Sequence, residues 1–146
     1  MLLYLDMNCF NRPFDNQNQA RIVLEATAVF TILQRIVEGI DHLAWSVILD
    51  FENSRHPLID RRTEIARWAL HSVVNVAIDE RVTCLAQELT SAGCKALDSV
   101  HLACAEVAAC DYFLTCDDQL LKQVKRLNLS LRVKNPTIFI KEQMNA

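Results

Sequence analysis

The sequence predicts an α/β fold of three layers, in which helices cover both faces of a central parallel sheet of four to five strands. Short apolar runs of strand character alternate with longer segments of helical periodicity. Consecutive strands are thus separated by helices, which parallel strands need for their crossover connections. A length of 146 residues, 51% of them hydrophobic, is enough for a buried core, and we expect a single domain over residues 1–146.

The first half of the chain is expected to alternate strand and helix. The predicted elements are a strand over 2–6, a helix over about 19–37, a strand at HLAW, and helices at VILDFENS and over about 58–70. Gly39 stops the long helix, Ser46 can cap the next one, and Pro57 separates the last two. A polar, Asn-rich loop that contains Pro13 follows the first strand.

The second half repeats this alternation. Its predicted elements are a strand at VVNVAI, a helix at ERVTCLAQELTSA, a helix over 95–110, a strand at YFLTC and a helix at DDQLLKQVKRL. Asp79 can cap the first of these helices, and Gly93 closes it. A final strand lies either near 131–133 or in TIFI.

Composition excludes several classes of function. Gly39 and Gly93 are the only glycines, so neither a Walker loop nor a dinucleotide-binding G-x-G-x-x-G is possible. No uncharged apolar stretch approaches the roughly 18 residues of a membrane span, and no signal-like leader is apparent, so we expect a cytoplasmic protein with no membrane partner. The six cysteines contain no C-x-x-C pair, and we expect reduced, packed thiols.

The chain has a net charge of -3, so it lacks the overall positive charge that is typical of many nucleic-acid-binding proteins. Basic side chains nevertheless gather in two groups. The first comprises Arg55, Arg61, Arg62 and Arg67, and the second comprises Lys122, Lys125, Arg126, Arg132 and Lys134. Each group is either a solvated helix face or a set of phosphate contacts.

Two apolar strands end at an aspartate, the first at Asp6 and the later one, YFLTC, at Asp117. If these strands are parallel neighbours, both carboxylates lie at the carboxyl edge of the sheet, where ligands of such sheets bind. A strand-end Asp is often only a helix N-cap, and Asp117 is open to that interpretation. Two such residues favour a functional edge.

Two further acids are candidates for the same edge. Asp98 lies in the first turn of the helix over 95–110, beside its apolar stripe, and His101 follows one turn later. A first-turn Asp also interacts favourably with the helix dipole, so a structural role remains open. Glu52 follows the second strand, with Asp50 as an alternative on another face of the same helix.

A cluster of these carboxylates predicts a cation. Two unit charges about 4 Å apart repel by roughly 4 kcal/mol at an effective dielectric of about 20. Mg²⁺ or Mn²⁺ would remove this conflict, because hard divalent ions take oxygen ligands and keep waters that can act as nucleophiles. Asn8 adds an amide that can orient water or Asp6 without adding charge.

The residues resemble the PIN domain ribonucleases over nearly the whole chain. The matching segments are LYLDMN, DFENS, KALDSVHLACA and FLTCDD. The third is the most specific, because an Asp followed by x-x-His-x-Ala-x-Ala is characteristic of bacterial PIN proteins. The resemblance implies an acidic metal site formed by Asp6, Glu52, Asp98 and Asp117, supported by Asn8 and Thr115, with Asp118 as an additional ligand.

The resemblance also implies a function and partners. PIN ribonucleases cut single-stranded or structured RNA endonucleolytically with the help of a metal, and many bacterial relatives are dimeric toxins that a partner protein inhibits. We therefore expect a Mg²⁺- or Mn²⁺-dependent ribonuclease whose partners are RNA, a cognate antitoxin and a second copy of the chain. The long Asn-rich segment after Asp6 departs from the simplest family pattern.

Other interpretations fit the residues less well. A haloacid-dehalogenase-like phosphatase needs a second Asp where this chain has Asn8, and a receiver domain needs adjacent acids after the first strand. The remaining alternative is a PIN-fold protein that binds RNA or a protein without cleaving RNA. We expect His101 to be a buried packing or hydrogen-bonding residue and not a ligand. We expect Trp45 and Trp68 to be core residues and not stacking platforms.

Overall fold

A five-stranded sheet in the order β3-β2-β1-β4-β5 forms the centre of the protein, which a computed structural model describes over residues 1–145. Every neighbouring pair of strands is parallel. The strands are β1 (Leu2–Leu5), β2 (His42–Ser46), β3 (Ser72–Val76), β4 (Tyr112–Leu114) and β5 (Arg132–Lys134). The predicted parallel sheet is confirmed.

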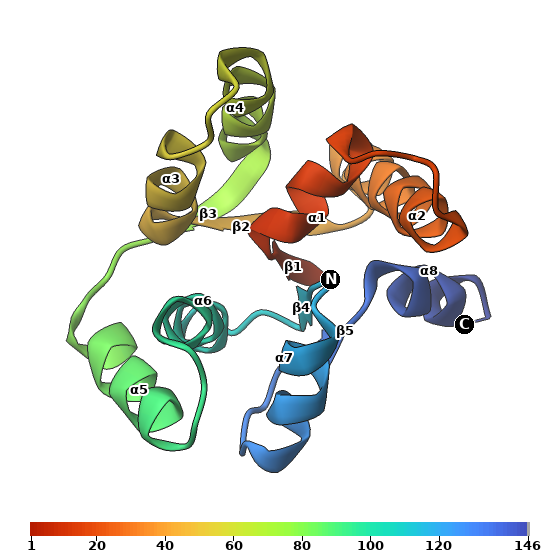
Figure 1. Ribbon diagram of the computed structural model, residues 1–146. Helices are drawn as coiled ribbons and strands as arrows, with labels where there is room; N and C mark the ends of the chain where they lie inside the picture. Colours follow the sequence, from red (N-terminus) through yellow and green to blue (C-terminus); the bar gives the residue numbers. More distant parts are fainter. Residues whose placement is uncertain (146) are drawn as a thin grey trace.

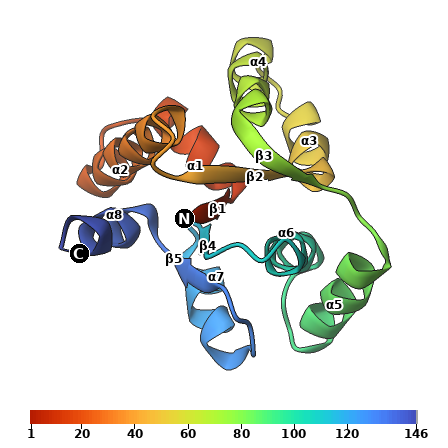
Figure 2. The same cartoon turned by 180° about the vertical axis from the view of Figure 1, so that it is seen from behind.

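Helices cover both faces of this sheet and give the molecule its three layers (Figures 1 and 2). Within residues 1–145 they are α1 (Met7–Asn11), α2 (Ala20–Val37), α3 (Val47–Ser54), α4 (Ile59–Ala66), α5 (Glu80–Ser91), α6 (Ala96–Val107), α7 (Asp118–Gln123) and α8 (Pro136–Met144), with 3-10 turns η1 (Arg12–Phe14), η2 (Arg67–His71) and η3 (Val124–Arg126). Helices α1 to α4 lie on one face and α5 to α7 on the other, while α8 returns to pack beside α2.

Side-chain caps begin two helices at the predicted positions. Ser46 Oγ accepts a hydrogen bond from Leu49 N at 3.2 Å, and Asp79 Oδ1 accepts one from Val82 N at 3.0 Å. Each cap satisfies a backbone N–H group that has no partner inside its own helix. Helices α3 and α5 therefore start directly after these residues.

Several elements differ from the prediction, and α7 and α6 are shorter than the helices expected at DDQLLKQVKRL and over 95–110. The segment after Asp6, expected to be a loop, begins with α1, because the Asp6 carboxylate accepts a hydrogen bond from Met7 N and caps that helix. The helix expected over about 58–70 ends at Ala66 and continues as η2. TIFI belongs to α8 and is not a strand, since Asn135 caps this helix and Pro136 starts it.

The core lies on both faces of the central strands. The Tyr4 ring of β1 stacks on Phe113 of β4, with ring centroids 5.3 Å apart. Trp45 is fully buried and meets the edge of Phe10, which confirms its packing role, and Trp68 is partly buried against the same core. Burial on both faces is what parallel strands between two helical layers require.

The cysteines are free thiols, and all but Cys84 are buried, as predicted for reduced packing residues. No helix within residues 1–145 is both long enough and apolar enough to cross a membrane.

Candidate metal centre

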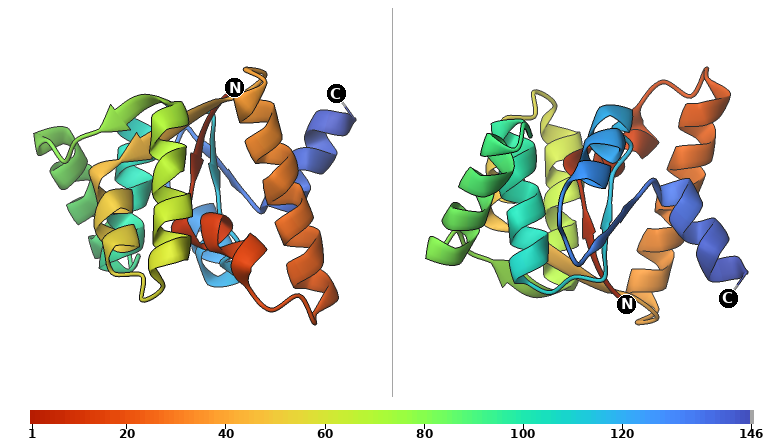
Figure 3. Two further views of the ribbon diagram at one scale, coloured as in Figure 1. Left: turned by 90° about the horizontal axis from the view of Figure 1, so that it is seen from above. Right: turned by 90° about the horizontal axis from the view of Figure 1, so that it is seen from below.

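The carboxyl ends of β1 and β4 lie side by side, and α1 and α7 leave the sheet from this same end (Figure 3). Leu5 pairs with Leu114 in the parallel register, and Asp6 N donates a hydrogen bond to Leu114 O at 2.9 Å. Asp6 and Thr115, the next residue of each strand, are therefore neighbours. We use the term acidic site for the four predicted carboxylates at this edge, Asp6, Glu52, Asp98 and Asp117.

Two polar side chains hold the Asp6 carboxylate in place. Thr115 Oγ1 donates to Asp6 Oδ2 at 2.8 Å, and Asn8 Nδ2 donates to the same oxygen at 3.1 Å. The Asn8 amide also spans the two strand ends, because its Oδ1 accepts a hydrogen bond from Cys116 N at 3.0 Å. Asn8 and Thr115 thus orient a carboxylate that is itself buried.

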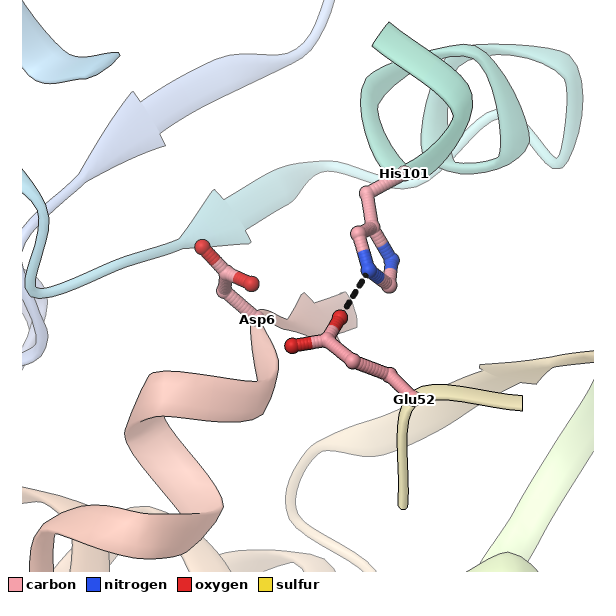
Figure 4. Close-up of side chains that lie close together, drawn as sticks. All are labelled: Asp6, Glu52 and His101. Atoms are coloured by element: carbon pink, nitrogen blue, oxygen red, sulfur yellow. Dashed lines mark hydrogen bonds and ion pairs between the residues drawn. The ribbon is translucent and has the colours of Figure 1, made fainter. Parts of the chain in front are cut away.

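Glu52 from α3 and His101 from α6 meet beside Asp6 (Figure 4). His101 Nε2 lies 2.6 Å from Glu52 Oε1. One possible ligand atom from each of Asp6, Glu52 and His101 lies within 4.8 Å of the other two. Asp50, the alternative to Glu52, instead accepts a hydrogen bond from Trp45 Nε1 at 2.8 Å.

Asp98 and Asp117 border this close group but do not belong to it. Asp98 lies in the first turn of α6. Burial raises the pKa of Asp98, and the negative charge of Asp117 raises it further. Asp117 caps α7, because its Oδ1 accepts hydrogen bonds from Gln119 N at 2.9 Å and Leu120 N at 3.3 Å. Asp117 therefore has the capping contact that its sequence position suggested and also acts electrostatically on the site.

The electrostatics of the acidic site favour a cation. Burial raises the pKa of Asp6 to about 6; His101 and the hydrogen bond from Thr115 lower it, while the charges of Glu52 and Asp98 raise it. Within residues 1–145, no Lys or Arg forms an ion pair with any of the four carboxylates. The charges of His101 and Lys95 lower the pKa of Asp98, but no Lys or Arg of the described residues pairs directly with the clustered carboxylates, and such oxygen donors fit a hard divalent ion such as Mg²⁺ or Mn²⁺.

Asp118 is held by an arginine from a distant part of the chain. Arg21 Nη1 donates to Asp118 Oδ2 at 2.6 Å, and Arg21 Nη2 donates to Asp118 Oδ1 at 2.9 Å. The two hydrogen bonds and the charge of Arg21 lower the pKa of Asp118. Asp118 is thus paired with Arg21, and it is not among the residues whose possible ligand atoms lie close together.

Replacing Asp118 with asparagine is therefore expected to leave the affinity for Mn²⁺ within about twofold of the wild-type value, since Asp118 is an exposed residue that neither belongs to the close group nor hydrogen-bonds to any of its members. Titration with Mn²⁺, followed by the electron paramagnetic resonance signal of the free ion, measures this affinity. A tenfold or larger loss would return Asp118 to the ligand set.

Sequence reasoning underestimated two residues of the site. His101 is buried, as expected, but it also reaches the acidic site, and its position one turn after Asp98 was the available signal. Tyr4 stands in the middle of the apolar run LLYL and gave no such signal, yet its hydroxyl lies 2.6 Å from His101 Nδ1.

Comparison with known proteins identifies a solved structure with a similar fold. No protein-family model matches the chain, and no curated protein matches it. Among solved structures, the chain is similar to the crystal structure of VapBC2 from Rickettsia felis bound to a DNA fragment from their promoter, with a TM-score of 0.60 and 14% sequence identity. The match covers 92% of this chain and 98% of that chain. At this identity the likeness concerns the fold, and it confirms the predicted PIN-like architecture.

Proposed function

We propose that this protein is a Mg²⁺- or Mn²⁺-dependent endoribonuclease and the toxin of a toxin–antitoxin pair. The observation that carries the proposal is the acidic site, in which buried and half-buried carboxylates gather at the carboxyl edge of a PIN-like sheet. Within residues 1–145 no Lys or Arg is paired with them. This charge balance favours a divalent cation and, through it, a phosphodiester substrate.

The contacts of the site residues support two roles, which are binding of the ion and orientation of Asp6. Asp6 and Glu52 would hold the ion, because an oxygen of each belongs to the close group, and the other two carboxylates would complete the shell directly or through water. Thr115 and Asn8 keep Asp6 oriented through hydrogen bonds to Oδ2. A bound divalent ion would supply a water of lowered pKa and stabilise charge on the leaving oxygen.

The first basic group offers the better phosphate contacts. Arg55 is exposed and follows α3 as its C-cap, three residues after Glu52. Its guanidinium lies 5.5 Å from the centroid of the Phe51 ring. In the second basic group, Lys134 lies on the edge strand β5, and its Nζ is 3.8 Å from the carboxylate of Glu142 in α8. This lysine is therefore already paired with an acid. We therefore assign Arg55 to contact with the RNA backbone.

Partner proteins form the second part of the proposal. The similar solved structure is a VapBC2 assembly on promoter DNA. This chain has an apolar groove of ≈ 370 Å³, lined by Phe10, Phe14, Phe30 and Trp68 among others, and Phe30 is 61% exposed. We assign this groove to a cognate antitoxin and propose a homodimer for the free toxin. Light-scattering masses of the chain, alone and with the product of the neighbouring gene, test both assignments.

Incubation with a mixed pool of labelled RNAs tests the nuclease. Cleavage is expected with Mn²⁺ or Mg²⁺, and it should disappear with a chelator and in the Asp6→Asn variant. Circular dichroism establishes that both proteins are folded, and a Mn²⁺ titration establishes that the wild type is loaded. If the folded, loaded wild type cuts no RNA, the chain is instead a PIN-fold module that binds RNA or a protein without turnover.

A further inference from the structure

Four side chains from four elements form a continuous line of hydrogen bonds that ends at the acidic site. Ser46 Oγ at the end of β2 lies 2.6 Å from the Tyr4 hydroxyl of β1, which lies 2.6 Å from His101 Nδ1 of α6. His101 Nε2 then lies 2.6 Å from Glu52 Oε1 of α3. The side chains of Ser46, Tyr4 and His101 are buried, whereas the Glu52 side chain is 29% exposed.

The proton positions along this line follow from the direction of the bond at its end. With the Glu52 carboxylate as the acceptor, the bond to Glu52 is donated by a proton on His101 Nε2. In a neutral ring Nδ1 is then the acceptor, and the Tyr4 hydroxyl is its donor. The Tyr4 oxygen in turn accepts from Ser46. Burial raises the pKa of Tyr4, which keeps this hydroxyl protonated.

The surroundings of Tyr4 keep the line rigid. Its ring stacks on Phe113 with an interplanar angle of 10° and meets the His101 ring edge-on, with ring centroids 5.7 Å apart. Ser46 Oγ is tied to the start of α3, because it accepts a hydrogen bond from Leu49 N. The orientation of the imidazole is thus set by the core of the sheet and not by solvent.

We propose that His101 is a positioning residue for Glu52 and not a metal ligand. A ring nitrogen that carries a proton has no lone pair for a cation, although His101 Nε2 lies within the close group of possible ligand atoms. The hydrogen bond occupies Oε1 of Glu52, and within residues 1–145 Oε2 of Glu52 has no hydrogen-bond partner. Oε2 is therefore the Glu52 oxygen that would bind an ion at this site. The inference deepens the proposed function and rests on it for the identity of that ion.

Proton–nitrogen correlation NMR of the histidine rings tests the proton position directly, and comparison with His101→Gln assigns the signals. The metal-free protein is expected to show His101 with its proton on Nε2, and this proton should remain when Mg²⁺ is added to saturation. A proton on Nδ1 alone, or the loss of the Nε2 proton on adding Mg²⁺, would overturn the proposal. This readout needs no RNA cleavage.

Affinity for Mn²⁺ tests the consequence for Glu52. Tyr4→Phe keeps the stacked ring and removes the hydroxyl that fixes His101, so Mn²⁺ binding should weaken about 10-fold, as for other groups that orient ligands. Tyr112→Phe is the matched control, because that hydroxyl bonds Glu142 and Arg132 away from the site, and its affinity should match the wild type. Equal affinities in the two variants would contradict the proposal.

His101 variants complete the series. His101→Gln places an amide donor near the position of Nε2 and should retain Mn²⁺ affinity within about 3-fold, whereas His101→Leu should lose about 10-fold to 100-fold. Equal losses in both would mean that the ring acts as a ligand. If the wild type binds no Mn²⁺, the proposed nuclease fails, and the NMR measurement still decides whether His101 donates to Glu52.

Discussion

Asp6→Asn is expected to reduce metal-dependent RNA cleavage at least about 100-fold, a larger effect than the 10-fold to 100-fold typical of residues that only orient ligands. Asparagine has the same shape and keeps an oxygen that can accept from Met7 N, so the cap of α1 survives. The change removes one negative charge from the centre of the acidic site. Initial rates on one labelled RNA at fixed Mn²⁺ measure the loss.

The matched control for this variant is Asp60→Asn. Asp60 is exposed in the first turn of α4, and its replacement changes the net charge by the same amount. Its cleavage rate should stay within about twofold of the wild type, since isolated surface substitutions have small effects. An Asp6→Asn protein that retains more than a third of the wild-type rate would remove Asp6 from the catalytic site.

Without metal, the same Asp6→Asn substitution is expected to stabilise the fold at pH 8. The pKa of Asp6 is raised by burial to about 6, so the folded protein holds this proton more tightly than the unfolded chain does. The ionised carboxylate therefore destabilises the fold above pH 6, and the penalty disappears as the pH falls below about 4. We expect a gain of about 1 to 3 kcal/mol at pH 8 and almost none at pH 4.

Urea unfolding of both proteins in a chelator measures this difference at each pH. Adding Mn²⁺ at about 100 times its dissociation constant should stabilise the wild type by about 2.7 kcal/mol and the variant much less, so the order of stability reverses. A variant less stable than the wild type in chelator at pH 8 would show that hydrogen bonding to Asp6, and not burial of its charge, dominates.

Local patterns were sufficient to predict most of the fold. Alternating apolar runs and helical periodicity placed the first four strands and the long helices, and Ser46 and Asp79 were recognisable caps. The short helix α1 was missed, because a helix of five residues has no periodicity to detect and depends on the cap from Asp6. TIFI was ambiguous for a similar reason, since β-branched residues favour strands while Asn135 and Pro136 begin a helix.

The acidic residues of the candidate site could be predicted from strand ends and from the helices that follow them, but the contacts of Asp118 and Tyr4 with distant residues could not. Asp6 was found because it follows an apolar strand at a sheet edge. Asp118 and Arg21, which form an ion pair, are 97 positions apart, so the local sequence around either residue does not predict the pair. The same holds for the contact between Tyr4 and His101, which also spans 97 positions. Such contacts depend on the packing of elements, which patterns within one element do not encode.

The place of β1 between β2 and β4 has a consequence for synthesis of the chain. Asp6 is made before its partner Thr115, which lies 109 positions later in the chain. A nascent chain that has emerged only as far as α5 therefore contains Asp6 and Glu52 but lacks Asp98, His101 and Thr115. The acidic site cannot assemble until α6 and the residues after β4 have left the ribosome. If the protein is a nuclease, the order of its strands therefore withholds activity from any nascent chain that has not yet reached Thr115.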